Sequence, residues 1–157
     1  MTFTLESTAF KDMEMIPTKY SMKGGNLSPS IEWVDIPEGT KSFALIMEDI
    51  KGPLGSLMPI THWVLYNIPK NMNALRETVT EKELLECGII QCKNFIRKFN
   101  YAGPAPPFGV HTYRFRLYAL DTIFEKGKIR SKSTLKKMMK AHILNIAELH
   151  GTYSSRP

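Results

Sequence analysis

Four side chains that can hold or exchange a proton lie at the ends of apolar stretches in this sequence. Asp49 ends the stretch SFALIMED, His62 begins HWVLYNIP, and His111 and Tyr113 follow a loop rich in proline and glycine. Imidazole and phenol groups donate hydrogen bonds to anions, and a carboxylate orients an imidazole ring. The same groups could act as a general acid and base, so these residues leave binding and catalysis both open.

The other histidines have simpler interpretations. The apolar side chains that follow Thr134 recur at three- and four-residue spacing, and His142 falls on that stripe, which favours a core position. His150 would lie at the end of the same helix, beside Gly151, where it interacts with the helix dipole. Neither histidine is therefore predicted to belong to a site.

The loop GPAPPFG, residues 103–109, is stiffened by proline. Its prolines fix backbone torsions and remove amide donors, whereas Gly103 and Gly109 allow close approach and unusual torsions. A rigid loop lowers the entropy cost of presenting a binding group. A tight crossover between strands would need the same residues, so the loop alone does not distinguish a pocket wall from a connection.

Short apolar stretches separated by turn residues make up most of the chain. The expected strands are 31–34, 42–50, 62–68, 89–91 and 113–120, with turns at 37–39, 53–55 and 69–71. Within 113–120 one parity is apolar and the other is mixed, as in a strand with one buried face. Several such strands without long helices between them favour a mainly β fold, an antiparallel β-sandwich, over a parallel doubly wound sheet.

One helix is predicted near the C-terminus. Its apolar stripe would comprise Leu135, Met138, Met139, His142, Ile143, Ile146 and Leu149. Ser131 or Ser133 would cap its start and Gly151 would end it. With its lysine face the helix could lie on a membrane surface, but we favour a helix that covers one edge or end of the sheet, because any docked helix needs such a stripe.

Composition places the chain among ordinary globular proteins. Its 157 residues, 43% hydrophobic and 23% charged, fit a single domain spanning 1–157. The N-terminus has no basic segment followed by an apolar core, so a cytoplasmic protein that is not membrane-integral is expected. The net charge of +6 lies on lysine-rich stretches without interleaved aromatic residues, which argues against nucleic-acid binding.

Four segments together resemble the phosphatidylethanolamine-binding protein family, in particular its bacterial and archaeal Raf-kinase-inhibitor-like branch. They read NLSPSIEWVDIPEGTKSFALIMED, HWVLYNIP, GPAPPFGVHTYRFRLYALD and AHILNIAELHGTY, and they span nearly the full length in the expected order. The combination of the GPxPPxGxH loop with HW upstream and AELxGTY downstream carries the resemblance.

The resemblance implies antiparallel sheets packed as a sandwich with helices near the C-terminus. It also implies a small surface pocket for an anion such as phosphate or a phospholipid headgroup. Carried over residue by residue, that pocket would draw on Asp49, His62, Gly103, Pro104, His111 and Tyr113. Each imidazole would donate to the anion and the tyrosine hydroxyl would add another donor. No cofactor or metal is implied.

The chain departs from the family pattern beside the expected pocket. Where relatives usually read Asp-Pro-Asp-x-Pro, this chain has Asp49-Ile50-Lys51-Gly52-Pro53, and Thr112 replaces the arginine that usually follows the loop histidine. If Lys51 faces the pocket, a simple anion should bind more readily and a zwitterionic headgroup less well. The loss of arginine at Thr112 acts in the opposite direction, so both residues are predicted modifiers of specificity.

Three classes of function follow from these observations. The leading hypothesis is a protein that binds a small anion or phospholipid headgroup and performs no chemistry of its own. The alternative is an interaction protein that inhibits a kinase or protease, acting as a monomer or homodimer. An enzyme is the least favoured class, because Cys87 and Cys92 lie outside the matched segments and no GxSxG elbow is present. Asp49, His62 and His111 would form a metal triad only at suitable distances.

Overall fold

The structure is a computed structural model that describes residues 1–51 and 58–155 of the chain. Its strands are β1 (Thr4–Glu6), β2 (Ile31–Val34), β3 (Ser42–Asp49), β4 (Ile60–Pro69), β5 (Ala74–Leu75), β6 (Ile90–Gln91), β7 (Val110–Leu120) and β8 (Ile143–Ser154). The helices are η1 (Thr18–Tyr20, a 3-10 turn), α1 (Glu81–Glu86) and α2 (Lys132–Met139). The expected turn at 53–55 lies outside the described residues.

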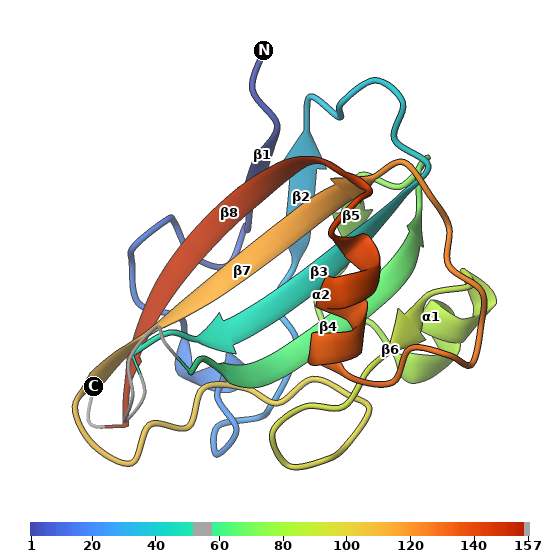
Figure 1. Cartoon of the computed structure of the whole chain (residues 1–157). Helices are drawn as coiled ribbons and strands as arrows, with labels where there is room; N and C mark the ends of the chain where they lie inside the picture. The colour runs from blue at the N-terminus through green and yellow to red at the C-terminus, as the bar shows by residue number, and fades with distance from the viewer. Residues whose placement is uncertain (52–57, 156–157) are drawn as a thin grey trace.

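The strands form two antiparallel sheets, as the alternation of apolar residues predicted (Figure 1). The small sheet has the order β1-β2-β5 and the large sheet the order β6-β4-β3-β7-β8. Their inner faces share one core, in which Phe43 of β3 packs against the rings of Phe3 and Trp33 at centroid distances of 6.2 and 5.4 Å. This is the packing of a β-sandwich, in which inward and outward side chains alternate along each strand.

A second core covers the other face of the large sheet. Leu135 and Met139 of α2 pack on Ala44 and Ile46 of β3 and on neighbouring apolar side chains. Figure 1 shows α2 in front of β3 and β4, with β7 and β8 extending beyond it. Because both of its faces are covered, β3 is buried along its whole length, which explains its nearly continuous apolar sequence.

The prediction of a C-terminal helix is right for α2 and wrong for the residues that follow. The helix begins after Ser131, whose hydroxyl accepts a hydrogen bond from the backbone of Thr134, but it ends at Met139 rather than near Gly151. The chain from Ile143 onward is instead β8, paired with β7 from Val110 to Leu120. The eleven residues of β7 offer β8 a full ladder of backbone hydrogen bonds, and this tertiary pairing overrides the helical spacing.

The structure also corrects the predicted positions of His142 and His150. His142 follows α2 and its Nδ1 lies 2.7 Å from Oδ1 of Asp121, half-exposed rather than in the core. His150 lies on β8, with its backbone N–H bonded to the Asp12 carboxylate, and therefore has no helix dipole to interact with. Within the described residues, no helix is long and apolar enough to cross a bilayer.

Candidate functional site

A β-bulge in β4 places His62 at the end of the sandwich. Met47 of β3 pairs with Trp63, but the next residue, Glu48, pairs with Thr61, so His62 is an extra residue in the ladder. Such a bulge changes the direction in which a side chain points, and bulges are common beside functional sites. The His62 ring accordingly lies edge-on to Tyr113 of β7, with ring centroids 5.2 Å apart and an interplanar angle of 87°.

Asp49 and His111 form a close pair across the ends of β3 and β7. The Nδ1 atom of His111 lies 2.7 Å from Oδ2 of Asp49, and the other carboxylate oxygen accepts the backbone N–H of Lys51 at 2.9 Å. The side chain of Asp49 is 4% exposed and that of His111 is 13% exposed. A carboxylate only accepts when ionised, so Nδ1 of His111 carries the proton and Nε2 remains for a ligand.

His62 is held by the segment that precedes the proline-rich loop. Its Nδ1 lies 2.7 Å from the carbonyl oxygen of Ala102, and the backbone N–H of Ala102 donates to the carbonyl of His62 at 3.0 Å. A carbonyl accepts only, so Nδ1 carries the proton here too. Burial lowers the pKa of His62 despite the opposing effects of the Ala102 carbonyl and Asp49, and the ring is therefore neutral at neutral pH.

These groups line one cavity of about 350 Å³. Its lining comprises Asp49, Lys51, Ile60, His62, Phe95, Ala105, Pro107, Phe108 and His111. The polar side chains thus lie among apolar ones, which is the usual composition of a small-molecule site. A volume of this size falls within the range of roughly 300–1,000 Å³ typical of ligand pockets.

Gly103 and Pro104 support the loop and do not line this cavity. The backbone N–H of Gly103 donates to Oδ1 of Asn26 at 2.7 Å, and the carbonyl of Pro104 accepts from Met22 at 3.0 Å. A Cβ at Gly103 would meet the carbonyl oxygen of Tyr20 at 2.0 Å, so only glycine fits. The loop is therefore anchored at its first residues, and Ala105, Pro107 and Phe108 form the cavity wall.

Tyr113 lies beneath the site. Its side chain is fully buried, and its hydroxyl has no hydrogen-bond partner among the described residues. Burial, reinforced by the charge of Asp49, raises the pKa of Tyr113 well above its usual value, so the phenol keeps its proton. The residue supports the ring of His62 and holds an unused donor near the carboxylate.

The two predicted specificity modifiers differ in position. Lys51 belongs to the cavity lining together with His111. Thr112 does not line the cavity; its carbonyl accepts the backbone N–H of Ile50 at 2.9 Å within the ladder between β3 and β7. Of the two predicted modifiers, the cavity lining therefore includes Lys51 and not Thr112.

The apolar half of the cavity was not predicted from the sequence. Phe95 packs on the ring of His62 at a centroid distance of 4.9 Å and is 44% exposed, and Phe108 is 79% exposed. Exposed aromatic rings beside buried polar groups are a recognisable sign of a binding surface. Phe108 stands within the quoted loop, but the fold alone brings Phe95 to it.

The site lacks several features of known catalytic centres. Its described lining contains no serine, threonine or cysteine that could act as a nucleophile. Within residues 1–51 and 58–155, no group of three or more His, Cys, Asp or Glu side chains has an arrangement that could hold a metal ion. The free Nε2 atoms of His62 and His111 can accept or exchange a proton.

Comparison with known sequences identifies relatives along nearly the whole chain. The model of the phosphatidylethanolamine-binding protein family matches residues 6–154. A UPF0098 protein from Methanothermobacter thermautotrophicus is 40% identical over 149 residues, covering 95% of this chain and 97% of that protein. A UPF0098 protein from Aquifex aeolicus is also 40% identical, over 152 residues, covering 94% of this chain and 85% of that protein.

Solved structures show the same architecture. A phosphatidylethanolamine-binding protein homologue from Chlamydia trachomatis has a TM-score of 0.87 and 33% identity, covering 98% of both chains. YbcL of Escherichia coli has a TM-score of 0.89 and 30% identity, covering 99% of this chain and all 100% of that one. With a matching family model and relatives of this similarity over nearly its whole length, the chain belongs to the phosphatidylethanolamine-binding protein family.

Proposed function

We propose that the cavity at the ends of β3, β4 and β7 binds a small phosphate-bearing anion, free or as a phospholipid headgroup, without performing chemistry on it. The observation that supports this most directly is the pair of imidazole rings fixed by their Nδ1 atoms, at 2.7 Å from Asp49 and 2.7 Å from Ala102. Fixed rings present their Nε2 atoms without further loss of entropy on binding.

The two rings act differently toward the ligand. Asp49 fixes the ring of His111 through Nδ1, so Nε2 is directed to a phosphate oxygen and donates to it when the ring carries its second proton, and Lys51 adds a cation to the lining. Neutral His62 accepts at Nε2, so it takes a hydrogen bond from a protonated phosphate oxygen. The expectation that both rings donate is thereby refined: the site suits a phosphate that keeps one proton.

Lys51 sets the proposed preference among phosphate ligands. An ammonium group at the mouth attracts a simple phosphate and repels the ammonium of a phosphoethanolamine headgroup. The apolar side chains of Phe95 and Phe108 would contact whatever the phosphate is attached to. We therefore expect inorganic phosphate and uncharged phosphomonoesters to bind more tightly than phosphoethanolamine.

The experiment is a histidine-ring NMR titration with inorganic phosphate and with phosphoethanolamine. The molecule supplies its own reference, because His142 pairs with Asp121 at the same 2.7 Å that separates His111 from Asp49, but His142 does not line the cavity. Phosphate should shift the resonances of His62 and His111 and leave His142 unchanged. Equal shifts in all three rings, or none, would contradict the proposal.

A variant sharpens the test of specificity. Lys51→Met keeps the stem of the side chain and removes the charge, so the preference for phosphate over phosphoethanolamine should fall by a few-fold. His111→Asn should abolish the shift at His62 as well, because the phosphate loses its donor. Unchanged phosphate affinity in His111→Asn, measured by calorimetry, would remove the basis of the assignment.

Inhibition of a protease is the second candidate function. One solved neighbour is a carboxypeptidase Y inhibitor in complex with its cognate proteinase, with a TM-score of 0.58 at 15% identity, which establishes a shared fold only. The exposed Phe108 and Phe95 give this chain an apolar surface that a protein partner could cover. Failure to inhibit carboxypeptidase Y at micromolar concentration would count against it.

A further inference from the structure

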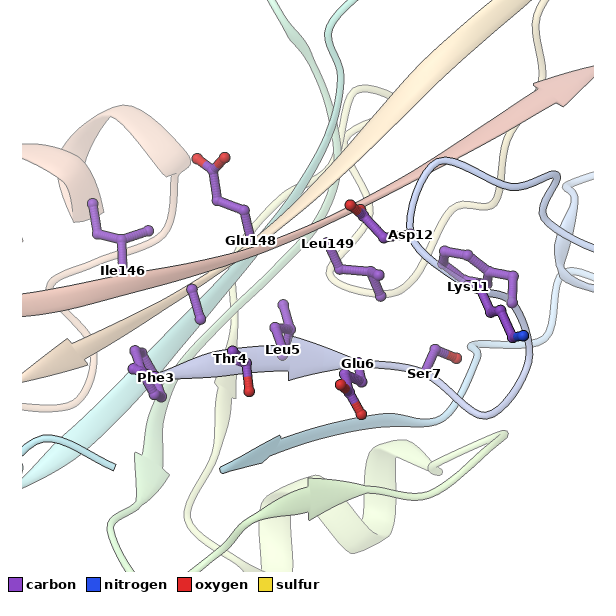
Figure 2. A pocket seen from close by; sticks show the side chains of 12 residues that line it. Phe3, Thr4, Leu5, Glu6, Ser7, Lys11, Asp12, Ile146, Glu148 and Leu149 are labelled. Atoms are coloured by element: carbon purple, nitrogen blue, oxygen red, sulfur yellow. The ribbon is translucent and has the colours of Figure 1, made fainter. Parts of the chain in front are cut away.

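A cavity larger than the histidine cavity lies between the edges of the two sheets. Its volume is about 770 Å³, and Figure 2 shows it flanked by β1 and β8, the outermost strands of the small and the large sheet on this side. Its floor consists of apolar side chains of the core, namely Phe3, Leu5, Phe10, Ala147 and Leu149. We call this cavity the β1–β8 groove.

Backbone groups of β8 face the groove without a strand to pair with. The carbonyl of His150 accepts from Met13 and its N–H donates to Asp12, so both backbone groups of His150 point away from β7. Since the direction alternates along a strand, Glu148 also presents its N–H and C=O away from β7. Residues 12–16 cover this edge only from His150 onward, where the N–H of Ile16 donates to the carbonyl of Thr152 and the N–H of Thr152 donates to the carbonyl of Glu14.

β1, on the other side of the groove, also presents backbone groups that point away from its partner strand. Trp33 of β2 donates its backbone N–H to Asn73, on the side away from β1, so it forms a non-hydrogen-bonded pair with Leu5. The backbone groups of Leu5 therefore also point away from β2, toward β8. The groove thus has unpaired peptide groups on both sides, and unpaired edges are the usual template for adding another strand.

The charges around the groove specify the occupant further. The lining includes the carboxylates of Glu6, Asp12 and Glu148 and the ammonium of Lys11, and Arg116 of β7 pairs with Glu148 from outside the lining. Glu6 also stands directly opposite Glu32 in the β1–β2 ladder, a like-charge pair that is unfavourable unless a cation approaches. In a chain of net charge +6, this rim is a local acidic region suited to lysine or arginine side chains.

We propose that the β1–β8 groove binds an extended peptide segment of a partner protein, with alternating apolar and basic residues. The segment adds as a strand to the free edge of β8 at Glu148, places its apolar side chains on Leu5 and Leu149, and directs its basic side chains to Glu6 and Asp12. The groove is separate from the histidine cavity, since the two share no lining residue.

The probe is an acetylated, amidated heptapeptide that alternates valine and lysine and carries a fluorescent label, followed by anisotropy against the whole protein. It should bind, whereas a peptide with glutamate for lysine should bind at least tenfold more weakly because of the acidic rim. A peptide N-methylated at alternate residues should also lose at least tenfold, because it cannot complete the main-chain bonds. Equal binding by all three peptides, or none, would overturn the proposal without requiring any protein variant.

A pair of variants tests the edge itself. Glu148→Ala removes the carboxylate and keeps the backbone N–H, whereas Glu148→Pro removes both; this N–H points away from β7, so the β7–β8 ladder keeps its bonds. The proline variant should bind the valine–lysine peptide at least tenfold more weakly than the alanine variant. Far-UV circular dichroism and the temperature of unfolding verify that both variants are folded.

Self-association is the outcome that would replace the proposal. If the two variants bind the peptide alike, strand addition at Glu148 is wrong. If wild type forms a dimer on size-exclusion chromatography with light scattering that Glu148→Pro abolishes, and the peptide does not compete, the edge belongs to a second copy of the chain. Exposed Ile143 and Ile146 on β8 would then lie in that interface.

Discussion

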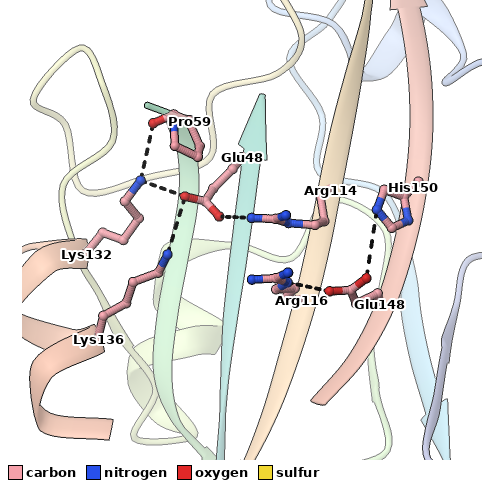
Figure 3. Close-up of polar contacts among 8 residues, drawn as sticks. All are labelled: Glu48, Pro59, Arg114, Arg116, Lys132, Lys136, Glu148 and His150. Atoms are coloured by element: carbon pink, nitrogen blue, oxygen red, sulfur yellow. Dashed lines mark hydrogen bonds and ion pairs between the residues drawn. The ribbon is translucent and has the colours of Figure 1, made fainter. Parts of the chain in front are cut away.

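Glu48 and Asp49 are consecutive carboxylates at the end of β3, yet their surroundings are opposite. Glu48 points to the outer face of the large sheet, where its oxygens accept from Arg114 at 3.1 Å and Lys132 at 2.6 Å (Figure 3). Asp49 points to the inner side, where it holds His111. Because side chains alternate along a strand, a one-residue step separates a structural ion cluster from a candidate binding site.

The two carboxylates differ in whether the groups they contact can be reached by a ligand. Glu48 is completely buried, and the Lys136 ammonium approaches at 3.9 Å, so it is surrounded by cations from α2 and β7. Burial tends to raise the pKa of Glu48, but Lys132, Lys136 and Arg114 outweigh it, and the pKa lies below its usual value. Asp49 instead holds the ring of His111 through Nδ1, and this ring lines a cavity that a ligand can enter.

The largest effect is expected for Glu48→Ala. Removing one partner of a buried ion cluster leaves uncompensated charges, and Arg114 and Lys132 are only 14% and 19% exposed. The free energy of unfolding should fall by about 3–5 kcal/mol, measured by urea denaturation. Phosphate affinity of the folded protein should stay within about twofold, because Glu48 does not line the cavity.

Asp49→Asn is the matched control for that variant. The amide keeps an acceptor for the Lys51 N–H and nearly the same shape, so stability should fall by no more than about 1–2 kcal/mol. Phosphate binding should instead weaken strongly, since His111 loses the carboxylate that orients its ring. Equal stability losses in the two variants would mean that both carboxylates are structural.

The next effect in size is the pH dependence of the free energy of unfolding, to which His62 and Glu48 contribute in different pH ranges. The pKa of buried His62 lies below its ordinary value of 6.5 and that of Glu48 below 4.5, so in both cases the unfolded chain binds protons more readily. The stabilisation that depends on neutral His62 is present above pH 6.5 and is lost as the pH falls below that value. The stabilisation that depends on ionised Glu48 is lost only as the pH falls below 4.5. Each contributes a slope of at most about 1.4 kcal/mol per pH unit.

The measurement is the free energy of unfolding across that range in two variants. His62→Gln should remove the decline that starts below pH 6.5 and keep the one that starts below pH 4.5, whereas Glu48→Gln should do the reverse. A wild-type stability that rises on acidification from pH 7 to pH 5 would contradict the burial of neutral His62.

The sequence predicted correctly those strands and helices whose residue pattern is local in the chain. The alternation in 113–120 predicted a strand correctly, and turn residues delimited β2, β3 and β4 to within two residues. The spacing of Leu135 and Met139 predicted α2 correctly, but the same spacing continued into β8, where pairing with β7 determined the structure. Local patterns carry propensity, whereas strand pairing depends on a partner distant in sequence.

The same distinction applies to the candidate site. Asp49, His62 and His111 lie on element ends that the apolar patterns located, and the structure brings them together. Gly103 and Pro104 stand in the same loop motif as His111, yet they face Tyr20 and Met22, because a motif does not say which side of a loop faces the cavity. Phe95 reaches His62 only through the fold, so no spacing could have indicated it.

The smallest effect is expected for Tyr113→Phe. This variant tests whether the Tyr113 hydroxyl, which lies on the same side of the sheet as Asp49, donates to the ligand. The Tyr113 hydroxyl is buried without a partner among the described residues, so removing it relieves an unpaired polar group, and stability should stay unchanged or rise by up to about 1 kcal/mol. The ring remains, so the edge-on contact with His62 is preserved. If phosphate affinity, measured by calorimetry, also stays within twofold, Tyr113 supports the site without touching the ligand. A tenfold loss would instead mean that the ligand draws the hydroxyl into the cavity and that the inner face of β7 contributes a donor beside His111.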